Sequence, residues 1–143
     1  MIETGAADAV PVRWAVATPA LMRSATNLET DQMKLLTKAN RLKLEANARK
    51  TEIEGEDDHR PVVKLFDPCG AATWLLTEIE GDIAFGLCDL GMGSPELGSV
   101  SITELEAIKG PLGIGIERDQ YFEAEMTISE YAEAARASGS IAA

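Results

Sequence analysis

The sequence predicts an α+β fold, in which a mainly antiparallel sheet of four or five strands carries two or three helices packed on one face. The central part of the chain contains a strong hairpin pattern, and shorter β-rich runs lie on either side of it. Helical patterns are few and lie mostly near the ends of the domain. A parallel doubly wound sheet needs a crossover helix between successive strands, and the sequence has too few helical stretches for that architecture.

The first expected element is a helix from about Lys38 to Arg49, with Thr37 as its N-cap. Basic residues are concentrated between positions 34 and 50, and an acidic loop follows from Glu52 to Arg60. An exposed basic face is the ordinary outcome for a surface helix, because its polar side faces water. The alternative is a patch that contacts phosphate or an acidic partner. Apolar residues at helical spacing support the helix: Leu35, Ala39, Leu42 and Ala46.

Strands are expected next. A β-rich run at 62–66 follows a proline, and the runs 73–80 and 83–89 are joined by the two-residue link Gly81-Asp82, the strongest hairpin signal in the chain. Apolar alternation along 73–80 is irregular, so its register stays open. Another strand is expected at 97–102, and a final extended stretch at 114–122 has glycines that weaken its first half.

Two capping boxes mark the starts of the remaining helices. Thr103 and Glu106 are spaced to cap a short helix that ends before a Gly-Pro pair at 110–111. Thr127 and Glu130 are spaced to open a last helix that runs to about residue 137. Its apolar face would carry four residues: Ile128, Tyr131, Ala132 and Ala135.

Domain organisation follows from a change in composition near residue 33. Residues 1–32 are rich in alanine, contain two prolines and show no sustained period, so we expect a poorly structured N-terminal extension. A single domain is then expected over 33–143, with Met33 as its functional start. The alternative is a native arm that packs Trp14 and Val16 against the domain.

Charge and hydropathy limit the classes of partner. The net charge of −11 argues against nonspecific binding to nucleic acid, for which basic residues supply most of the affinity, and it is compatible with a basic protein partner. No apolar run reaches the roughly 18 to 20 residues that a membrane span needs. The first charged residues, Glu3 and Asp8, are acidic, unlike the start of a signal peptide. A cytoplasmic protein is therefore expected.

The sequence gives little support for nucleophilic catalysis. The single histidine, His59, lies in the acidic loop and is expected to be exposed. Cys69 and Cys88 are too far apart for a redox or zinc motif, and reduced, buried thiols are expected, with a cross-strand disulfide as the alternative. Neither a nucleophile elbow nor a phosphate-binding loop occurs in the sequence. No cofactor is expected.

Four carboxylates near strand ends are the remaining candidates for chemistry. Asp89, Glu96, Glu117 and Asp119 would suit Mg²⁺ or Ca²⁺, which prefer oxygen ligands, if the sheet brought them together. The simpler interpretation is that these acids pair with Arg118 or a nearby lysine, cap turns or face solvent, so they are only weak metal candidates. Glu96, Glu117, Arg118 and Asp119 are instead the candidate surface for binding another protein.

Several short motifs follow one another from Met33 to Phe122. They are MKLLTK at 33–38, the strand around Trp74, PELG at 95–98, TELE at 103–106, KGPLG at 109–113 and IERDQYF at 116–122. In these motifs the chain resembles a family of small bacterial proteins that carry a domain of unknown function and are often encoded on plasmids and integrative elements. The resemblance implies a small stand-alone bacterial domain and implies no activity.

These observations predict an uncharacterised accessory protein of a mobile genetic element, a non-enzymatic module that binds another, basic protein through an acidic surface. The alternative is a metal-assisted hydrolase, a nuclease or phosphoesterase, that uses the clustered carboxylates. The sequence leaves the oligomeric state open.

Overall fold

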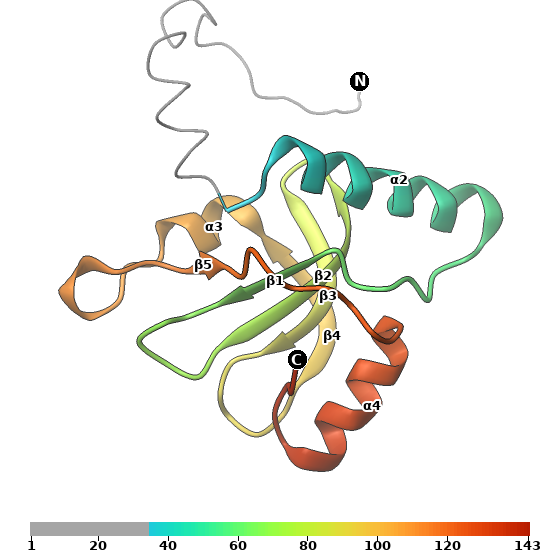
Figure 1. The fold of residues 1–143 in the computed structure, drawn as a ribbon. Coiled ribbons are helices and arrows are strands. Elements are labelled where there is room, and N and C mark those ends of the chain that lie inside the picture. The colour runs from blue at the N-terminus through green and yellow to red at the C-terminus, as the bar shows by residue number, and fades with distance from the viewer. Residues whose placement is uncertain (1–34) are drawn as a thin grey trace, which may run out of the picture. The chain divides into compact units, whose positions relative to one another are not determined.

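The computed structural model describes residues 35–143, which form one compact unit (Figure 1). The predictions for residues 1–32 and for a start at Met33 lie outside the described residues. The order of elements confirms the predicted α+β class. It consists of α2 (Lys38–Glu54), β1 (Val63–Phe66), β2 (Thr73–Glu80), β3 (Ile83–Asp89), β4 (Glu96–Ser101), α3 (Ile102–Ala107), the short 3₁₀ turn η2 (Pro111–Gly113), β5 (Glu117–Arg118) and α4 (Ile128–Ser138).

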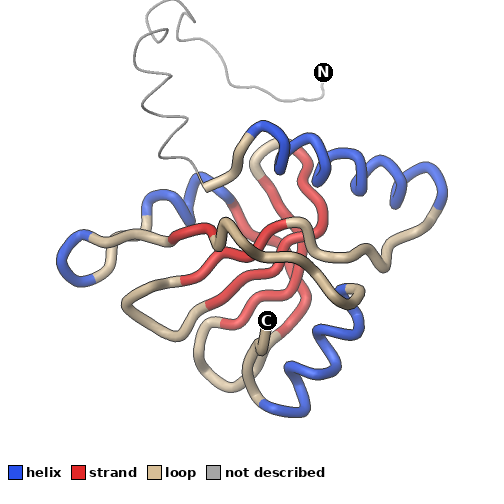
Figure 2. The backbone as a smooth tube through the Cα atoms, in the orientation of Figure 1, coloured by secondary structure: helices blue, strands red, loops and turns tan. Residues whose placement is uncertain are grey.

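The strands form one five-stranded antiparallel sheet in the order β4-β3-β2-β1-β5 (Figure 2). The predicted hairpin is confirmed, because β2 and β3 pair on either side of a turn in which Gly81 has a φ of 62°. The predicted final strand is much shorter than expected. The turn η2, where Leu112 has a φ of 66°, lies just before it, Gly115 forms an isolated bridge with Lys109, and only Glu117 and Arg118 pair with β1.

The sheet is covered on both faces. Helices α2 and α3 share one face, as predicted, whereas α4 lies against the other. The neighbouring residues Leu75 and Leu76 are both fully buried because successive side chains of a strand point to opposite faces. The larger core, on the face of α2 and α3, contains Leu35, Leu36, Leu44, Val63, Leu65, Trp74, Leu76, Ile79, Ala84, Ile102, Leu105 and Ile116. The smaller core contains Leu75, Leu87, Ile128, Tyr131, Ala132 and Ala135.

A β-bulge at Thr77 explains the irregular alternation in β2. The pairing with β3 shifts between Leu76 and Glu78, so Thr77 is an extra residue. After the bulge, Ile79 joins the same core as Leu76, although the odd spacing between them would otherwise put them on opposite faces. The sequence carries no local signal for this extra residue.

Helix α2 packs where β1 ends. Strand β1 pairs with β2 only from Thr73 to Leu76, so the carbonyl of Thr77 has no strand partner on that side. The side-chain amide of Asn47 in α2 donates to this carbonyl over 2.9 Å. The hairpin tip is held in the same way, because the Arg41 guanidinium donates to the carbonyl of Gly81 over 2.8 Å. Helix α2 thus replaces a neighbouring strand along the second half of β2.

The predicted N-cap of α2 is confirmed, and its predicted apolar face is wrong. The Thr37 hydroxyl accepts from the backbone of Asn40, whose side chain accepts in return from the backbone of Thr37, each over 3.0 Å. The helix ends at Gly55, beyond the predicted end. Its fully buried residue is Leu44, and Leu42 is 56% exposed, because the helix packs along a narrow strand edge.

Helix α3 begins two residues earlier than its predicted capping box. Ser101 is the N-cap, and Thr103 lies inside the helix. The carboxylate of Asp82, in the hairpin turn, accepts from the hydroxyls of both residues, over 2.5 Å from Ser101 and 2.7 Å from Thr103. Glu106 accepts from the backbone N–H of Leu35 over 3.2 Å instead of reaching back to Thr103. Hydrogen bonds to Asp82 and Leu35, which are distant in the sequence, therefore form in place of the predicted capping box.

Helix α4 agrees with its prediction throughout. Its capping box forms, with the backbone N–H of Thr127 donating to the Glu130 carboxylate over 2.9 Å. The helix ends at Gly139, which has a φ of 86°. The four residues predicted for its apolar face are its buried residues: Ile128, Tyr131, Ala132 and Ala135.

Candidate binding groove

The predicted protein-binding residues lie on opposite edges of the sheet. Glu96 begins β4, at one edge, and Glu117 and Arg118 form β5, at the other. Strands β3, β2 and β1 separate them. The structure therefore does not bring Glu96 together with the acids of β5.

Asp89 is a buried structural residue at the end of β3. One of its carboxylate oxygens accepts from the backbone N–H of Gly91 over 2.8 Å, and the other accepts from Ile141 over 3.0 Å. It ties the β3–β4 loop to the C-terminal segment. Its hydrogen-bonding capacity is used by the fold.

The residues around β5 make contacts within the chain. Asp119 accepts from the backbone N–H of Tyr121 over 2.9 Å and lies 3.8 Å from the ammonium of Lys64. The guanidinium of Arg118 donates to the carbonyl of Leu35. Within residues 35–143, no group of three or more histidine, cysteine, aspartate or glutamate side chains could hold a metal ion.

Both cysteines have free thiols in the part of the chain that the structure describes. Cys88 is half-buried, and this burial raises the pKa of its thiol. Cys69 is exposed, so the prediction that both thiols are buried is wrong for that residue. It lies in the loop between β1 and β2, outside the two cores.

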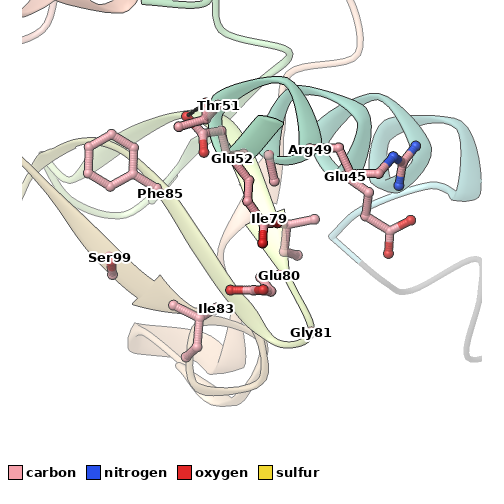
Figure 3. A pocket seen from close by; sticks show the side chains of 12 residues that line it. Glu45, Arg49, Thr51, Glu52, Ile79, Glu80, Gly81, Ile83, Phe85 and Ser99 are labelled. Carbon is pink, nitrogen blue, oxygen red and sulfur yellow. Dashed lines mark hydrogen bonds between the residues drawn. The ribbon is translucent and has the colours of Figure 1, made fainter. Parts of the chain in front are cut away.

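A groove lined by Ile83, Phe85 and Ser99 lies on the sheet beside α2 (Figure 3). It has a volume of about 650 Å³ and lies between α2 and the strands β2, β3 and β4. A second hollow of about 530 Å³ shares Thr51, Glu78 and Phe85 with it and continues past Leu97 to the start of α4. The two hollows together are called the acidic groove below.

The acidic groove combines negative charge with exposed apolar side chains. Ile83 on β3 is 49% exposed and Leu97 on β4 is 37% exposed, with Phe85 half-buried between them. Arg49 is the one basic residue among the described side chains that line it. Its acids come from α2, the following loop and β2, and they are Glu45, Glu52, Asp57, Asp58, Glu78 and Glu80.

A hydrogen-bond network fixes the carboxylate of Glu78 in the groove. The hydroxyl of Thr51 lies 3.0 Å from Glu78 Oε2, 2.9 Å from His59 Nε2 and 3.1 Å from the carbonyl of Glu56. A hydroxyl has one proton to donate, and carboxylate and carbonyl oxygens only accept. When Thr51 donates to Glu78, the short contact with His59 therefore requires an N–H on His59 Nε2. The chain of bonds then runs from His59 through Thr51 to Glu78.

The prediction that His59 is exposed is wrong, because the residue is only 6% exposed. The loop after α2 turns back over the sheet to reach β1, and the carbonyl of His59 accepts from the backbone N–H of Ile128 over 2.8 Å. The loop and the start of α4 are thereby joined. A single histidine in an acidic loop carries no sequence signal for this closure.

Asp58 forms the second link between that loop and α4. Its carboxylate accepts from the backbone N–H of Ser129 over 2.9 Å and from the Ser129 hydroxyl over 2.7 Å. These bonds stabilise the ionised form and hold the pKa of Asp58 below its ordinary value of 3.8. The negative charge also lies at the N-terminus of α4, where the helix dipole favours it. One wall of the acidic groove is therefore fixed in place.

No motif in the sequence indicates the acidic groove, because its residues come from α2, three strands, a loop and α4. The one sequence feature that could have indicated the groove is the pair of acids in the second half of β2. Glu78 and Glu80 follow an apolar run in a strand that the hairpin pattern places near the centre of the sheet.

One comparison with known proteins gives a match. A family model described as "Protein of unknown function (DUF2958)" matches residues 35–142. No curated protein and no solved structure matches the chain. The predicted resemblance to an uncharacterised domain family is thus confirmed, and its association with plasmids stays a prediction. Among the described residues, no helix has both the length and the apolar character needed to cross a membrane.

Proposed function

Because the chain belongs to the DUF2958 family, whose description assigns no activity, we propose a function from its own geometry. The protein is a non-enzymatic binding module that holds a basic segment of another protein in the acidic groove. The observation that carries this proposal is the joint presence of six carboxylates and an exposed apolar floor in one groove. Its role as an accessory protein of a mobile genetic element belongs to the same proposal and rests on the sequence resemblance.

The two properties of the groove have separate effects on binding. Exposed ion pairs contribute about 0.2 to 1 kcal/mol each, so the acids act mainly on the association rate and on the choice of a basic partner. Burial of one aliphatic side chain against Ile83, Phe85 and Leu97 contributes about 1.5 to 3 kcal/mol. The proposed ligand is therefore a segment with an apolar residue between basic ones.

The network around Glu78 supports a binding role. His59 and Thr51 hold this carboxylate, so it does not need to lose side-chain freedom when a cation binds. The alternative of a metal-assisted hydrolase loses its support, because its candidate carboxylates are distributed between opposite edges of the sheet and the buried end of β3. We therefore propose no reaction.

The test is the affinity of labelled seven-residue peptides, measured by fluorescence anisotropy. The array places lysine or arginine on both sides of valine, leucine or isoleucine, and a matched set places glutamate at the basic positions. We expect the basic set to bind, with an affinity that falls as NaCl is raised from 50 to 300 mM, and the acidic set to fail.

The groove is located by matched charge variants. The double variant Glu78→Gln, Glu80→Gln removes charge from the groove, and the double variant Glu104→Gln, Glu117→Gln removes the same charge from exposed positions on α3 and β5. We expect only the first to weaken binding. Equal weakening in both would show that the overall charge, and not the groove, attracts the peptide, and weakening in the second alone would place the site outside the groove.

A further inference from the structure

The two edges of the sheet are protected to very different degrees. Strand β5 has two residues, both charged. Strand β4 has six residues, from Glu96 to Ser101, with no charge after the first, no proline and no break in its pairing with β3. Soluble proteins usually protect an edge strand with charges, prolines, bulges or shortness, because its free backbone groups can pair with another chain.

The backbone groups of β4 that point outward can be assigned. The backbone N–H of Ile102 donates to the carbonyl of Asp82 over 2.9 Å, which makes these two residues a hydrogen-bonded pair. Hydrogen-bonded pairs alternate along an antiparallel ladder, so Val100, Gly98 and Glu96 also bond to β3. The backbone groups between them, on Leu97, Ser99 and Ser101, then point away from the sheet. Within residues 35–143 the outward groups of Leu97 and Ser99 have no backbone partner, whereas the carbonyl of Ser101, the N-cap, belongs to the first turn of α3.

This free edge continues into the acidic groove. Ser99 and Leu97 pair with Phe85 and Leu87 across the β3–β4 ladder, on the face that α4 partly covers. Both β4 residues line the groove, Ser99 in the larger hollow and Leu97 in the smaller. A strand added beside β4 would therefore direct every second side chain to the groove side of the sheet.

We propose that the basic segment binds as an additional strand on the free edge of β4. This inference rests on the proposed function and specifies the ligand's conformation and pattern. An apolar side chain lies beside Leu97, and a basic side chain two positions away lies beside Ser99, on the groove side of the sheet. Asp57 and Glu80 line the two hollows, and their charge attracts a cation on that side of the sheet. Residues between these positions point to the opposite face.

The net charge of the chain favours a basic segment over a second copy of the chain as the ligand of β4. Pairing of two β4 strands would place two acidic grooves side by side, and each chain carries a net charge of −11. A basic segment removes this repulsion, because its cations face the acids that line the groove. The occupant is therefore a segment of a different, basic protein.

The first test changes one outward backbone group. Proline at position 99 removes an N–H that points to solvent, so Ser99→Pro keeps the β3–β4 ladder, and Ser99→Thr is the control that keeps the N–H. We expect Ser99→Pro to weaken peptide binding about tenfold or more and Ser99→Thr to stay within about twofold of the parent. Circular dichroism and melting temperature establish that both variants fold.

The second test changes the peptide and does not depend on folding of a variant. Two analogues of the tightest-binding peptide carry N-methyl groups on alternate amides, one set at odd positions and the other at even positions. A strand bonds to its neighbour through one set only, so one analogue should lose binding and the other should keep it. Equal affinity of the two analogues would overturn strand addition.

The outcomes separate the two proposals. If the groove charge variant weakens binding while Ser99→Pro does not, the groove binds its ligand without a backbone ladder, and the strand inference is wrong. If no peptide of the array binds, both proposals are wrong. Sedimentation velocity tests whether a second copy of the chain binds to β4 instead. If the parent is a dimer and Ser99→Pro is a monomer, a second copy is the occupant and the inference is wrong.

Discussion

One face of the sheet has two halves that are built from the same strands. Helix α4 covers one half, and the other half is open. In the half under α4, Leu75 and Leu87 are fully buried against the helix. In the open half, the same strands β2 and β3 present Glu78 and Ile83 to the acidic groove. The difference shows that residues of one strand can serve stability at one end and remain free to contact a ligand at the other.

The bulge at Thr77 separates the two halves. Before it, β2 lies between two strands, and after it α2 replaces β1 as the neighbour. The bulge changes which side chains face α4, so that Glu78 follows Leu75 on that face. The open half should therefore tolerate substitution better than the covered half.

The largest effect is expected from a truncation under α4. Leu87→Ala should lower the free energy of unfolding by about 2 to 5 kcal/mol, because it leaves a cavity in a fully buried site. Ile83→Ala, on the same strand in the open half, should cost less than about 1 kcal/mol, since Ile83 is 49% exposed. Urea unfolding measures both. Similar losses for the two variants would contradict the division of the face.

The bulge itself should depend on one amide side chain. Asn47→Ala leaves the carbonyl of Thr77 without the donor that now lies 2.9 Å away, and we expect a loss of about 1 to 3 kcal/mol. Lys43→Ala, at an exposed position of the same helix, is the control and should change the stability by less than about 0.5 kcal/mol. Thermal unfolding followed by circular dichroism distinguishes them, and equal stability of the two variants would mean that α2 does not support the bulge.

The loop that closes the groove should give a pH-dependent contribution. The pKa of Asp58 is lowered in the folded state, so its stabilising effect is present above the ordinary value of 3.8 and is lost as pH falls through the lower folded pKa. Asp58→Asn removes this titration. Urea unfolding between pH 7 and pH 3 should therefore show a shallower acid loss in the variant than in the parent. Parallel curves for the two proteins would exclude this contribution.

The smallest effect on stability is expected in the groove. Glu80→Gln should leave the free energy of unfolding within about 0.5 kcal/mol of the parent, because this side chain is exposed at the end of β2. The same variant should weaken binding of the basic peptides. A large loss of stability would show that Glu80 belongs to the structural half of the face, contrary to its assignment.

Much of the fold could be predicted because its determinants are local. The β2–β3 hairpin depends on a two-residue turn, and α4 depends on a capping box and four apolar residues on one face. Elements with long-range partners were predicted less well. The hydrogen bond from Ser101 to Asp82 helps to place the N-cap of α3 at Ser101 and not at Thr103. The loop after α2 packs against the start of α4, and His59 is buried there.

The candidate site could not be predicted for the same physical reason. Carboxylates that lie near strand ends in the sequence, such as Glu96 and Glu117, reach opposite edges once the strand order places β4 and β5 apart. The acids that do meet come from a helix, a loop and a strand, and no spacing rule connects Glu52 with Glu80. The net charge favours a basic partner, and it does not indicate where such a partner would bind.

The most direct test of the groove is chemical-shift mapping of the ¹⁵N-labelled protein with a basic peptide of the array. We predict that the largest changes cluster at the amides of Ile83, Phe85, Leu97 and Ser99, while those of Glu117 and Arg118 stay unchanged. Changes centred on β5, or small changes spread over the whole acidic surface, would contradict the assignment of the groove as the binding site.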